Sequence, residues 1–428
     1  MLQELKLGFQ MRDPQRQNRF GSSFKVSYPD LPGITLSPRS VTLNQEMGKH
    51  DIVEIRYPRY SSALIKAVRT GVPVEIEWRN DKVSGKFVGY AVDVTYPTIQ
   101  KLERGINIVC IGASYPLKER ASKIWTNKTA SEIATDIAKK FKLKPMVTSS
   151  SIRFTQQSLA GHSYWEKLTE LAAKIGYGVQ VVGTELHFHP IDKMIDQFMT
   201  TIPVMAFKDP LQHPLSSYKA ATLDVFEPKL GDYIETSDYT RSTPTVGGVD
   251  PITGKTYLAK SSSNKVGKKL RKDTRDPLFS SIETSTVVAS DSMAKSLSEA
   301  RAQLGRLSIP AKGWGQGDPR IAPWRTIEVR GTGDTSDGFW IIKKVEHFFH
   351  IDGRYQVEFT CATDGTGAGK PSAFRPGSAG TIPTRNVVSE MATTNKRKPT
   401  STKLSKAAAM VTQKSGGYKV TPRKWKGD

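Results

Sequence analysis

The histidines are the residues whose type and spacing come nearest to a metal-binding pattern. His187 and His189 are two residues apart in a predicted strand, so both side chains lie on one face, as two ligands of a single site would. No third ligand is evident nearby, and the sequence has neither an HExxH motif nor a CxxC pair. We therefore favour two ordinary, partly exposed strand histidines over a metal centre, and we expect no bound metal.

A glycine-rich stretch, DGTGAGK at residues 364–370, is similar to a phosphate-binding loop. It fails the GxxxxGK[ST] spacing because Asp364 occupies the first glycine position and Pro371 replaces the required hydroxyl residue. No GxSxG nucleophile motif is present, and the scattered carboxylates do not single out a glycosidase pair. We therefore predict that the chain is not an enzyme and needs no cofactor.

Length and composition narrow the remaining classes of protein. The 428 residues predict two to four domains, at roughly 100–200 residues per domain. No apolar run approaches the ~18 residues of a membrane span, and the first residues lack a signal-peptide core. Two cysteines, Cys110 and Cys361, are too few for a disulfide scaffold or a self-contained zinc finger. We expect neither an integral membrane protein nor a small secreted domain.

The net charge of +22 is concentrated in two segments. Residues 366–428 carry 13 basic residues and two acids, and residues 241–281 carry nine basic residues and three acids. Such segments attract nucleic acid, anionic polymers or acidic protein surfaces. Both segments are also rich in Ser, Thr, Gly and Pro, so we favour solvated, flexible chain over a dedicated polyanion site.

Two clusters within these segments are the candidate anion or partner contacts. They are Lys268, Lys269, Arg271 and Lys272 in the first segment, and Lys396, Arg397 and Lys398 in the second. Nucleic-acid binders often interleave aromatic residues with basic ones, but residues 366–428 contain only Phe374, Tyr418 and Trp425. That sparse set favours a tether or an assembly arm, and we expect the isolated arm to be disordered.

Residues 1–117 are predicted to form an N-terminal β domain. Val74–Trp78 alternates apolar and polar residues, Phe87–Val94 does so more loosely, and Ile106–Ile111 is a more continuous apolar run. Turn residues separate these segments. Short strands at this spacing indicate an antiparallel sheet or a small barrel.

Residues 118–190 are predicted to form an α/β module. The sequences TASE at 129–132 and SYWE at 163–166 are capping boxes that open two amphipathic helices. A hairpin is expected over residues 179–188. The expected buried anchors of the two helices are Phe141 and Trp165.

Residues 191–365 are assigned to a second β domain that contains the basic insertion 241–281. A helix is expected to begin near Ser290, and strand-like sequence resumes from residue 326. The residues expected on the buried face of that helix are Met293, Leu297, Ala300, Leu304 and Leu307. The predicted fold class is therefore α+β: two small antiparallel β-barrel-like domains flank the α/β module, and a basic C-terminal arm, 366–428, follows.

The first and last β regions share a pattern. Ile76-Glu77-Trp78 matches Ile327-Glu328-Val329, and a cysteine follows 34 residues after each isoleucine, at Cys110 and Cys361. Any two four-stranded meanders look alike at this level, so the pattern leaves both interpretations open. If the repeat is real, one chain presents two similar edges, and three subunits could mimic six.

Several segments resemble the central hub proteins of bacteriophage tails, the late control protein D family that is related to the base of type VI secretion spikes. The segments are SYPLK at 114–118, WTNKTASEIA at 125–134, SYWEKL at 163–168, and GDPRI at 317–321 followed by Trp324 and IEV at 327–329. The resemblance covers roughly residues 42–365 by pattern and order. It does not include the basic segment near 254–275 or the arm after residue 366.

The resemblance implies a structural protein. Proteins of this kind form a homotrimeric ring in which two β domains per subunit give pseudo-sixfold symmetry, and the ring adapts a tail tube to a spike or tip. The implied partners are the tube protein, the spike or tip protein and the tape measure protein. The implied location is the virion tail, assembled in the host cytoplasm. A basic module that binds DNA or cell wall is the alternative.

Overall fold

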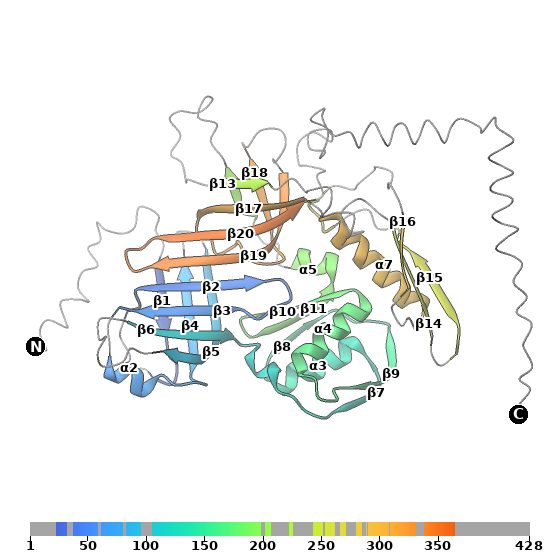
Figure 1. Ribbon diagram of the computed structural model, residues 1–428, viewed down its shortest axis with the longest axis horizontal. Coiled ribbons are helices and arrows are strands. Elements are labelled where there is room, and N and C mark those ends of the chain that lie inside the picture. The colour runs from blue at the N-terminus through green and yellow to red at the C-terminus, as the bar shows by residue number, and fades with distance from the viewer. Residues whose placement is uncertain are drawn as a thin grey trace, which may run out of the picture. The chain divides into compact units, whose positions relative to one another are not determined.

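The structure is a computed structural model of the chain (Figure 1). It describes residues 23–31, 37–58, 61–79, 83–95, 105–197, 202–206, 222–225, 243–250, 253–261, 266–270, 280–284, 288, 290–307, 309–330 and 338–363. All of them lie in one compact unit, residues 1–374, and the second unit, 375–428, lies outside the described residues. The predicted C-terminal arm and the glycine-rich stretch 364–370 therefore lie outside the described residues as well.

Strands dominate the described residues, at 48% against 23% helix. The helices are α2 (Ser62–Ala67), α3 (Ala130–Lys140), α4 (Tyr164–Ile175), α5 (Ile191–Gln197) and α7 (Asp291–Arg306), with a 3-10 turn η3 (Tyr115–Lys118). The strands are β1 (Ser23–Ser27), β2 (Ser40–Glu46), β3 (Ile52–Tyr57), β4 (Pro73–Arg79), β5 (Ser84–Thr95), β6 (Ile106–Gly112), β7 (Ile124–Thr129), β8 (Lys144–Val147), β9 (Arg153–Ser158), β10 (Tyr177–Val182), β11 (Glu185–Pro190), β12 (Val204–Ala206), β13 (Thr222–Val225), β14 (Thr243–Val249), β15 (Thr256–Lys260), β16 (Ser280–Glu283), β17 (Ile309–Gln316), β18 (Thr326–Arg330), β19 (Gly338–His350) and β20 (Tyr355–Thr363). The predicted α+β class agrees with this mainly β structure.

One large sheet unites the two ends of the described chain. Its strand order is β1-β4-β5-β6-β3-β2-β19-β20-β17-β13, and β18 and β12 extend from β19. Strand β2 pairs with β19 in antiparallel register, from Ser40 opposite His350 to Glu46 opposite Lys344. Figure 1 shows the consequence: blue β2 lies directly beside orange β19.

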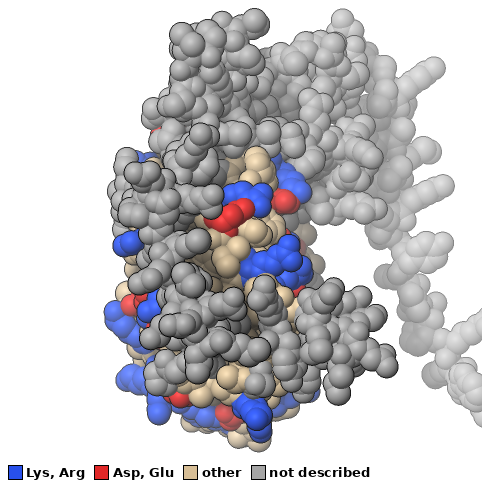
Figure 2. All heavy atoms as spheres, turned by 90° about the vertical axis from the view of Figure 1, so that its left-hand side faces the viewer, with Lys and Arg blue, Asp and Glu red and all other residues tan. Residues whose placement is uncertain are grey.

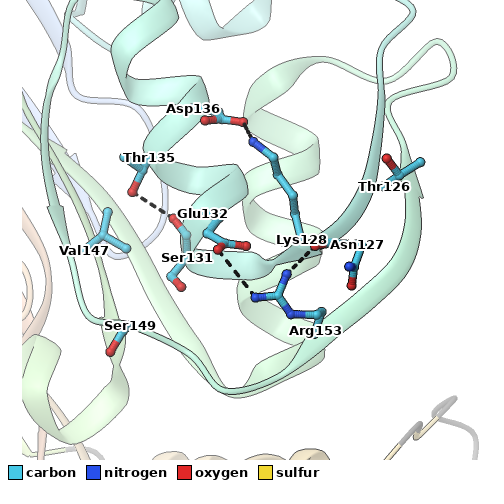
Figure 3. A pocket seen from close by; sticks show the side chains of 10 residues that line it. All are labelled: Thr126, Asn127, Lys128, Ser131, Glu132, Thr135, Asp136, Val147, Ser149 and Arg153. Carbon is cyan, nitrogen blue, oxygen red and sulfur yellow. Dashed lines mark hydrogen bonds and ion pairs between the residues drawn. The ribbon is translucent and has the colours of Figure 1, made fainter.

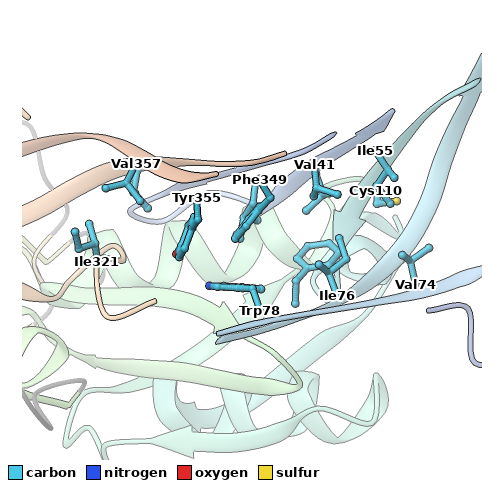
Figure 4. Close-up of a cluster of buried hydrophobic side chains, with 14 of the residues drawn as sticks. Val41, Ile55, Val74, Ile76, Trp78, Cys110, Ile321, Phe349, Tyr355 and Val357 are labelled. Atoms are coloured by element: carbon cyan, nitrogen blue, oxygen red, sulfur yellow. The ribbon is translucent and has the colours of Figure 1, made fainter. Parts of the chain in front are cut away.

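A single hydrophobic cluster fills the inner face of this sheet. It holds alternate residues from strands of both ends, such as Val41, Ile76, Val357 and Phe359, all at most 1% exposed. Trp78 on β4 lies 5.6 Å from Phe349 on β19, measured between ring centroids, so the sheet curves until the two ends face each other (Figure 4). Burial of this apolar surface is the main stabilising contribution that both ends share.

The prediction of two barrel-like domains is not confirmed. Neither end of the large sheet closes into a barrel among the described strands. The physical reason is the pairing of β2 with β19, because an edge strand that finds its partner in the other half does not close its own half. The domain boundaries at residues 117, 190 and 365 stay predictions.

The α/β module has the two predicted capping boxes. The hydroxyls of Thr129 and Ser163 each accept a hydrogen bond from the helix, and Glu132 and Glu166 accept from the cap N–H groups. Gly176 ends α4 in the left-handed conformation, at φ 73°. Trp165 is 9% exposed and buried as predicted. Phe141 is only partly buried, because it sits at the C-cap of α3, where the helix meets solvent.

The basic insertion was expected to be flexible, and this expectation is wrong for its described part. Strands β15, β14 and β16 form a three-stranded sheet that packs on α7. Val246 of β14, 1% exposed, joins the cluster that contains Met293 and Leu297 of α7, and this burial stabilises the sheet. The helix begins near Ser290 as predicted, but Leu304 is 39% exposed because it lies in the last turn.

Candidate assembly surfaces

Two of the seven basic candidates lie in the described residues. Lys268 and Lys269 are both exposed in the short segment 266–270. The neighbouring side chains Val266 and Leu270 are buried and hold the segment in place. The backbone N–H of Lys268 donates to Asp196 Oδ1 at 2.8 Å. The segment is therefore fixed against the fold, and the two lysines are held at the surface.

The other candidates, Arg271, Lys272, Lys396, Arg397 and Lys398, lie outside the described residues. On the face in Figure 2, Lys and Arg side chains occur at several separate places, with Asp or Glu beside some of them. Exposed ion pairs such as Lys86 with Glu75 (2.9 Å) and Arg56 with Glu54 (2.9 Å) show the same mixing. Such a surface does not select a polyanion over its whole area.

The two ends of the large sheet repeat the same strand arrangement. In the first half, β4, β5, β6, β3 and β2 lie side by side in that order, with β1 beyond β4. In the second half, β18, β19, β20, β17 and β13 lie in the same order, with β12 beyond β18. The chain passes through both sets in corresponding sequence. One difference is that β1 is antiparallel to β4, whereas β12 is parallel to β18.

A β-bulge at the same position confirms that these halves are copies. The register of β5 with β6 shifts just after Ala91, the residue opposite Cys110. The register of β19 with β20 shifts just after Ile342, the residue opposite Cys361. Ala91 and Ile342 are 251 positions apart in the sequence, and so are Cys110 and Cys361. Bulges are specific local features, so of the two interpretations that the sequence left open, the structure supports the repeat.

The seam between the halves uses one edge from each copy. Strand β2 of the first half pairs with β19 from Lys344 onward, beyond the part of β19 that pairs with β18. The counterpart of Lys344 in the first half is Asp93, where β5 has passed the end of β4. The counterpart of β2 in the second half is β13, at the end of the sheet. Within the described residues, neither β13 nor the end of β5 has a second neighbour, so each copy offers one unused edge.

Polar side chains form hydrogen-bonded pairs in and beside the second half of the large sheet. His347 is fully buried, and its Nδ1 lies 2.9 Å from the hydroxyl of Tyr355. Desolvation lowers the pKa of His347 to about 3. In the loop between β17 and β18, the partly buried carboxylate of Asp318 accepts hydrogen bonds from Arg320 Nε at 2.9 Å and Nη2 at 2.6 Å. Each of these polar pairs is satisfied within the fold, which indicates a structural role.

A polar pocket of about 510 Å³ opens at the start of α3 (Figure 3). Its charged side chains pair with each other: Lys128 Nζ lies 2.5 Å from Asp136, and Arg153 lies 3.6 Å from Glu132. Glu132 also accepts the N–H of Thr129 at 2.7 Å, which completes the cap of α3. The charged groups of this pocket are thus already used in holding the module together.

An apolar pocket of about 390 Å³ lies where α4, α7 and the large sheet meet. Gly176 is required there, because a Cβ on it would lie 2.6 Å from the carbonyl oxygen of Ser296. Trp324 lines the same pocket at φ 67°, a strained conformation for a bulky residue. Close packing and a strained turn indicate that this junction fixes the module against the sheet.

A buried glutamine makes a second link at this junction. Gln180 on β10 accepts a hydrogen bond from the N–H of Gly48 at 2.9 Å and donates to the carbonyl of Lys49 at 3.3 Å. Both partners belong to the turn between β2 and β3. The module is therefore attached directly to the first half of the sheet.

The residues considered for metal or nucleophilic chemistry are buried in the sheets. His187 and His189 are 3% and 5% exposed, rather than partly exposed as expected, and burial lowers the pKa of His189 to about 4. Cys110 and Cys361 are fully buried, and desolvation raises the pKa of Cys110 to about 12, so neither is a ready thiolate. The described residues contain no group of three His, Cys, Asp or Glu that could hold a metal ion.

In the described part of the chain, no helix has both the length and the apolar character that a membrane crossing requires.

Comparison with solved structures identifies the arrangement. The 43 kDa tail protein of prophage MuSo2 from Shewanella oneidensis is similar, with a TM-score of 0.52 and 14% identity over 81% of this chain and 99% of that one. A tail protein from Neisseria meningitidis gives a TM-score of 0.53 and 11% identity, covering 83% and 99% of the two chains. The chain has the fold of phage tail proteins. The resemblance inferred from sequence is confirmed at the level of fold.

A type VI secretion system component from E. coli is a weaker match. It has a TM-score of 0.48 and 10% identity, covering 79% of this chain and 76% of that one, and a score of this size does not establish a common fold. No protein-family model matches the chain, and no curated protein matches it in sequence. The phage tail fold is therefore recognised through structure.

The sequence patterns do not reveal which strands lie at the edges of the large sheet. Strand β2 contains an alternating SVTLNQE pattern that signals a strand but does not reveal its partner. Strand β13 has four residues, too few for a clear period. Edge status depends on which strands lie beside each other, a long-range property that no local pattern contains.

Proposed function

We propose that this chain is the structural hub of a phage tail or baseplate, and that three copies form a pseudo-sixfold ring. The observation that carries the proposal is the duplicated six-strand arrangement with its matching bulges. Three chains with two equivalent halves each supply six similar units. The tail fold of the chain supports a structural role in the virion tail.

The seam within the chain gives a model for contacts between chains. Strand β2 pairs with β19 within one chain. The equivalent pair between chains would be β13 of one chain with the end of β5 of the next chain. This contact is heterologous, since it uses two different edges, and a heterologous contact closes a ring if its rotation allows. A ring also protects both edges from unwanted strand pairing.

A ring of this kind would match two symmetries. Its six similar units fit a sixfold tail tube, while features that occur once per chain fit a threefold spike or tip. We propose the tube protein and the spike or tip protein as partners, with the tape measure protein as a further one. Assembly is proposed to take place in the host cytoplasm, and no bond-making step is part of this function.

The alternative, a basic module that binds DNA or cell wall, rests on the charge of residues 241–281 and 366–428. Lys268 and Lys269 stay candidates for an anionic partner because both are exposed. Much of the basic insertion is a folded sheet with aliphatic residues on its surface. That chemistry supports a protein partner better than a polyanion.

Cysteine crosslinking tests the proposed ring. By equivalence with the β2–β19 register, Thr95 of one chain and Asp224 of the next correspond to Glu346 and Thr42, a diagonal pair on one face of the seam. Such a pair is roughly 7–8 Å apart, too far for a disulfide but within reach of a short bis-maleimide. The double variant Thr95→Cys, Asp224→Cys should give covalent dimers and trimers with this reagent and nothing larger.

Each single variant serves as the matched control and should stay monomeric on a denaturing gel. The native Cys110 and Cys361 are buried and stay in place. A double variant that gives no covalent species, or a ladder that continues beyond three chains, would contradict the ring.

A further inference from the structure

The sheet formed by β15, β14 and β16 has one covered face and one open face. Val246 lies under α7 at 1% exposed, with Tyr257 and Ala259 partly buried beside it. Glu283 lies on the same side, where it forms an ion pair with Arg301 of α7 at 3.2 Å. Side chains alternate along a strand, so the residues between these point away from α7.

The open face carries large aliphatic side chains. Leu258 is 65% exposed, Ile282 is 66% exposed and Val249 is 50% exposed. The register brings them together: Leu258 lies opposite Gly247, and Ile282 lies opposite Thr245 on the other side of β14. Single exposed aliphatics are ordinary, but three on one small sheet form a patch that typically marks an interaction site.

Among the described residues, lysines outnumber carboxylates on the open side of this sheet. Lys260 lies opposite Thr245 on the open face and is exposed, and Lys255 is exposed at the end of the β14–β15 hairpin. Of the two acids nearby, Glu283 lies on the covered side in an ion pair with Arg301, and Asp250 lies at the hairpin end, where it accepts from Thr253 Oγ1 at 2.7 Å. The open face is therefore an aliphatic patch with lysines at its border.

We infer that the open face of the β14–β16 sheet docks a different protein whose surface has an apolar centre and an acidic border. Charge complementarity favours this occupant, because carboxylates would pair with Lys260 and Lys255 around buried aliphatics. A second copy in face-to-face contact would bring like lysines together. A nucleic acid would leave Leu258 and Ile282 against phosphates, without the aromatic stacking that such binders use.

This inference rests on the proposed tail function, since the partner is expected among the other tail proteins. The patch occurs once per chain and lies outside the duplicated strands. A ring of three chains would thus display three such patches. This number suits a threefold partner or three separate copies of one.

Site-specific photocrosslinking in the full-length chain tests the inference. The photoreactive amino acid p-benzoylphenylalanine replaces Leu258, tail particles are purified from the producing cells, and crosslinked peptides are identified by mass spectrometry. We expect one product with another tail protein, joined at a peptide that contains Asp or Glu near an apolar stretch. Adding Lys260→Glu should lower the crosslink yield about tenfold, the effect of roughly 1.4 kcal/mol in binding.

Controls separate docking from folding and from the tail assignment. The same amino acid at Ile124, which is 57% exposed on β7, should not give this product, and Lys260→Glu should leave the melting temperature unchanged. A crosslink to a second copy or to nucleic acid overturns the inference. Particles that contain the chain but yield no Leu258 crosslink overturn it alone, whereas particles that lack the chain overturn the tail function with it.

Discussion

The two halves of the large sheet have the same strand order but different connections. In the first half a tight turn, residues 47–51, joins β2 to β3. In the second half the corresponding strands, β13 and β17, are separated by an insertion that contains β14, β15, β16 and α7. The matching bulges opposite Cys110 and Cys361 lie in the part that did not change.

In the proposed ring, this difference would separate two tasks within one chain. The shared strands and bulges would supply the six similar units. The insertion occurs in only one half, so it lowers any sixfold symmetry to threefold and supplies a surface that the other half does not have. A duplicated fold can keep its assembly geometry while one copy gains a new contact.

The largest expected effects come from matched truncations in the shared core. Ile108 on β6 and Phe359 on β20 occupy equivalent positions and are 0% and 1% exposed. We expect Ile108→Ala to cost about 2–5 kcal/mol of unfolding free energy and Phe359→Ala about 3–5 kcal/mol. Since one cluster contains both residues, each variant should shift a single transition measured by chemical denaturation.

That outcome depends on the two halves unfolding together. If Ile108→Ala shifted one of two separate transitions and Phe359→Ala shifted the other, the halves would be independent domains. The seam between β2 and β19 would then contribute little to stability.

The helical module should depend on its contact with the first half. Trp165 packs against His50 with tilted rings, 4.5 Å apart between centroids, and His50 lies in the turn that joins β2 to β3. Trp165→Ala should cost about 3–5 kcal/mol, and the partly buried Phe141 gives a matched, smaller loss as Phe141→Ala. Thermal unfolding measures both, and equal losses would show that the contact with the first half adds nothing.

Local patterns in the sequence were enough for the helices, and they raised the repeat as one of two interpretations that the matching bulges decide. The capping boxes at Thr129 and Ser163 are local, because side chain and backbone partners lie three residues apart. The equal spacing of Ile76 to Cys110 and Ile327 to Cys361 also survives without knowledge of the fold. The union of both halves depends on Leu43 lying opposite His347, a pairing across about 300 residues that no local pattern specifies.

The candidate surfaces show the same limit. Counting charges found the basic insertion, but Leu258 and Ile282 become a patch only when β15 and β16 flank β14. The composition of this basic segment, which is rich in Ser, Thr and Gly, also suggested flexible chain. Burial of Val246 under α7 outweighs that composition.

The halves should also respond to pH in opposite directions. Burial raises the pKa of Asp51, next to β3, to about 7, and lowers the pKa of His347 on β19 to about 3. Asp51 favours the folded state at low pH, and this contribution is lost as pH rises from about 4 to 7. His347 contributes stability above pH 6.5 that is lost as pH falls toward 3.

Two variants separate these contributions. Asp51→Asn should gain stability relative to the parent as pH rises to 8, and His347→Gln should gain relative to the parent as pH falls to 4. Each pKa unit corresponds to about 1.4 kcal/mol, so denaturation midpoints at three pH values resolve the trends. Parallel curves for parent and variant would show that the residue does not titrate as described.

The smallest effects are expected at the exposed lysines. Lys268→Ala with Lys269→Ala should change the unfolding free energy by no more than about 0.5 kcal/mol, since both side chains are in solvent. If these lysines contact an acidic partner, the double variant should lower incorporation into tails and weaken its dependence on salt. Normal incorporation of the double variant into tails would show that neither lysine contacts a partner.

The most direct test of the trimeric ring is the symmetry and mass of the assembled full-length protein. A ring of three chains has three times the mass of the 47.3 kDa chain. Its end-on views by cryo-electron microscopy should have a strong sixfold component from the duplicated strands and a weaker threefold component from the insertion. A particle of six chains, or a chain that stays monomeric with its tube protein present, would contradict the trimeric ring.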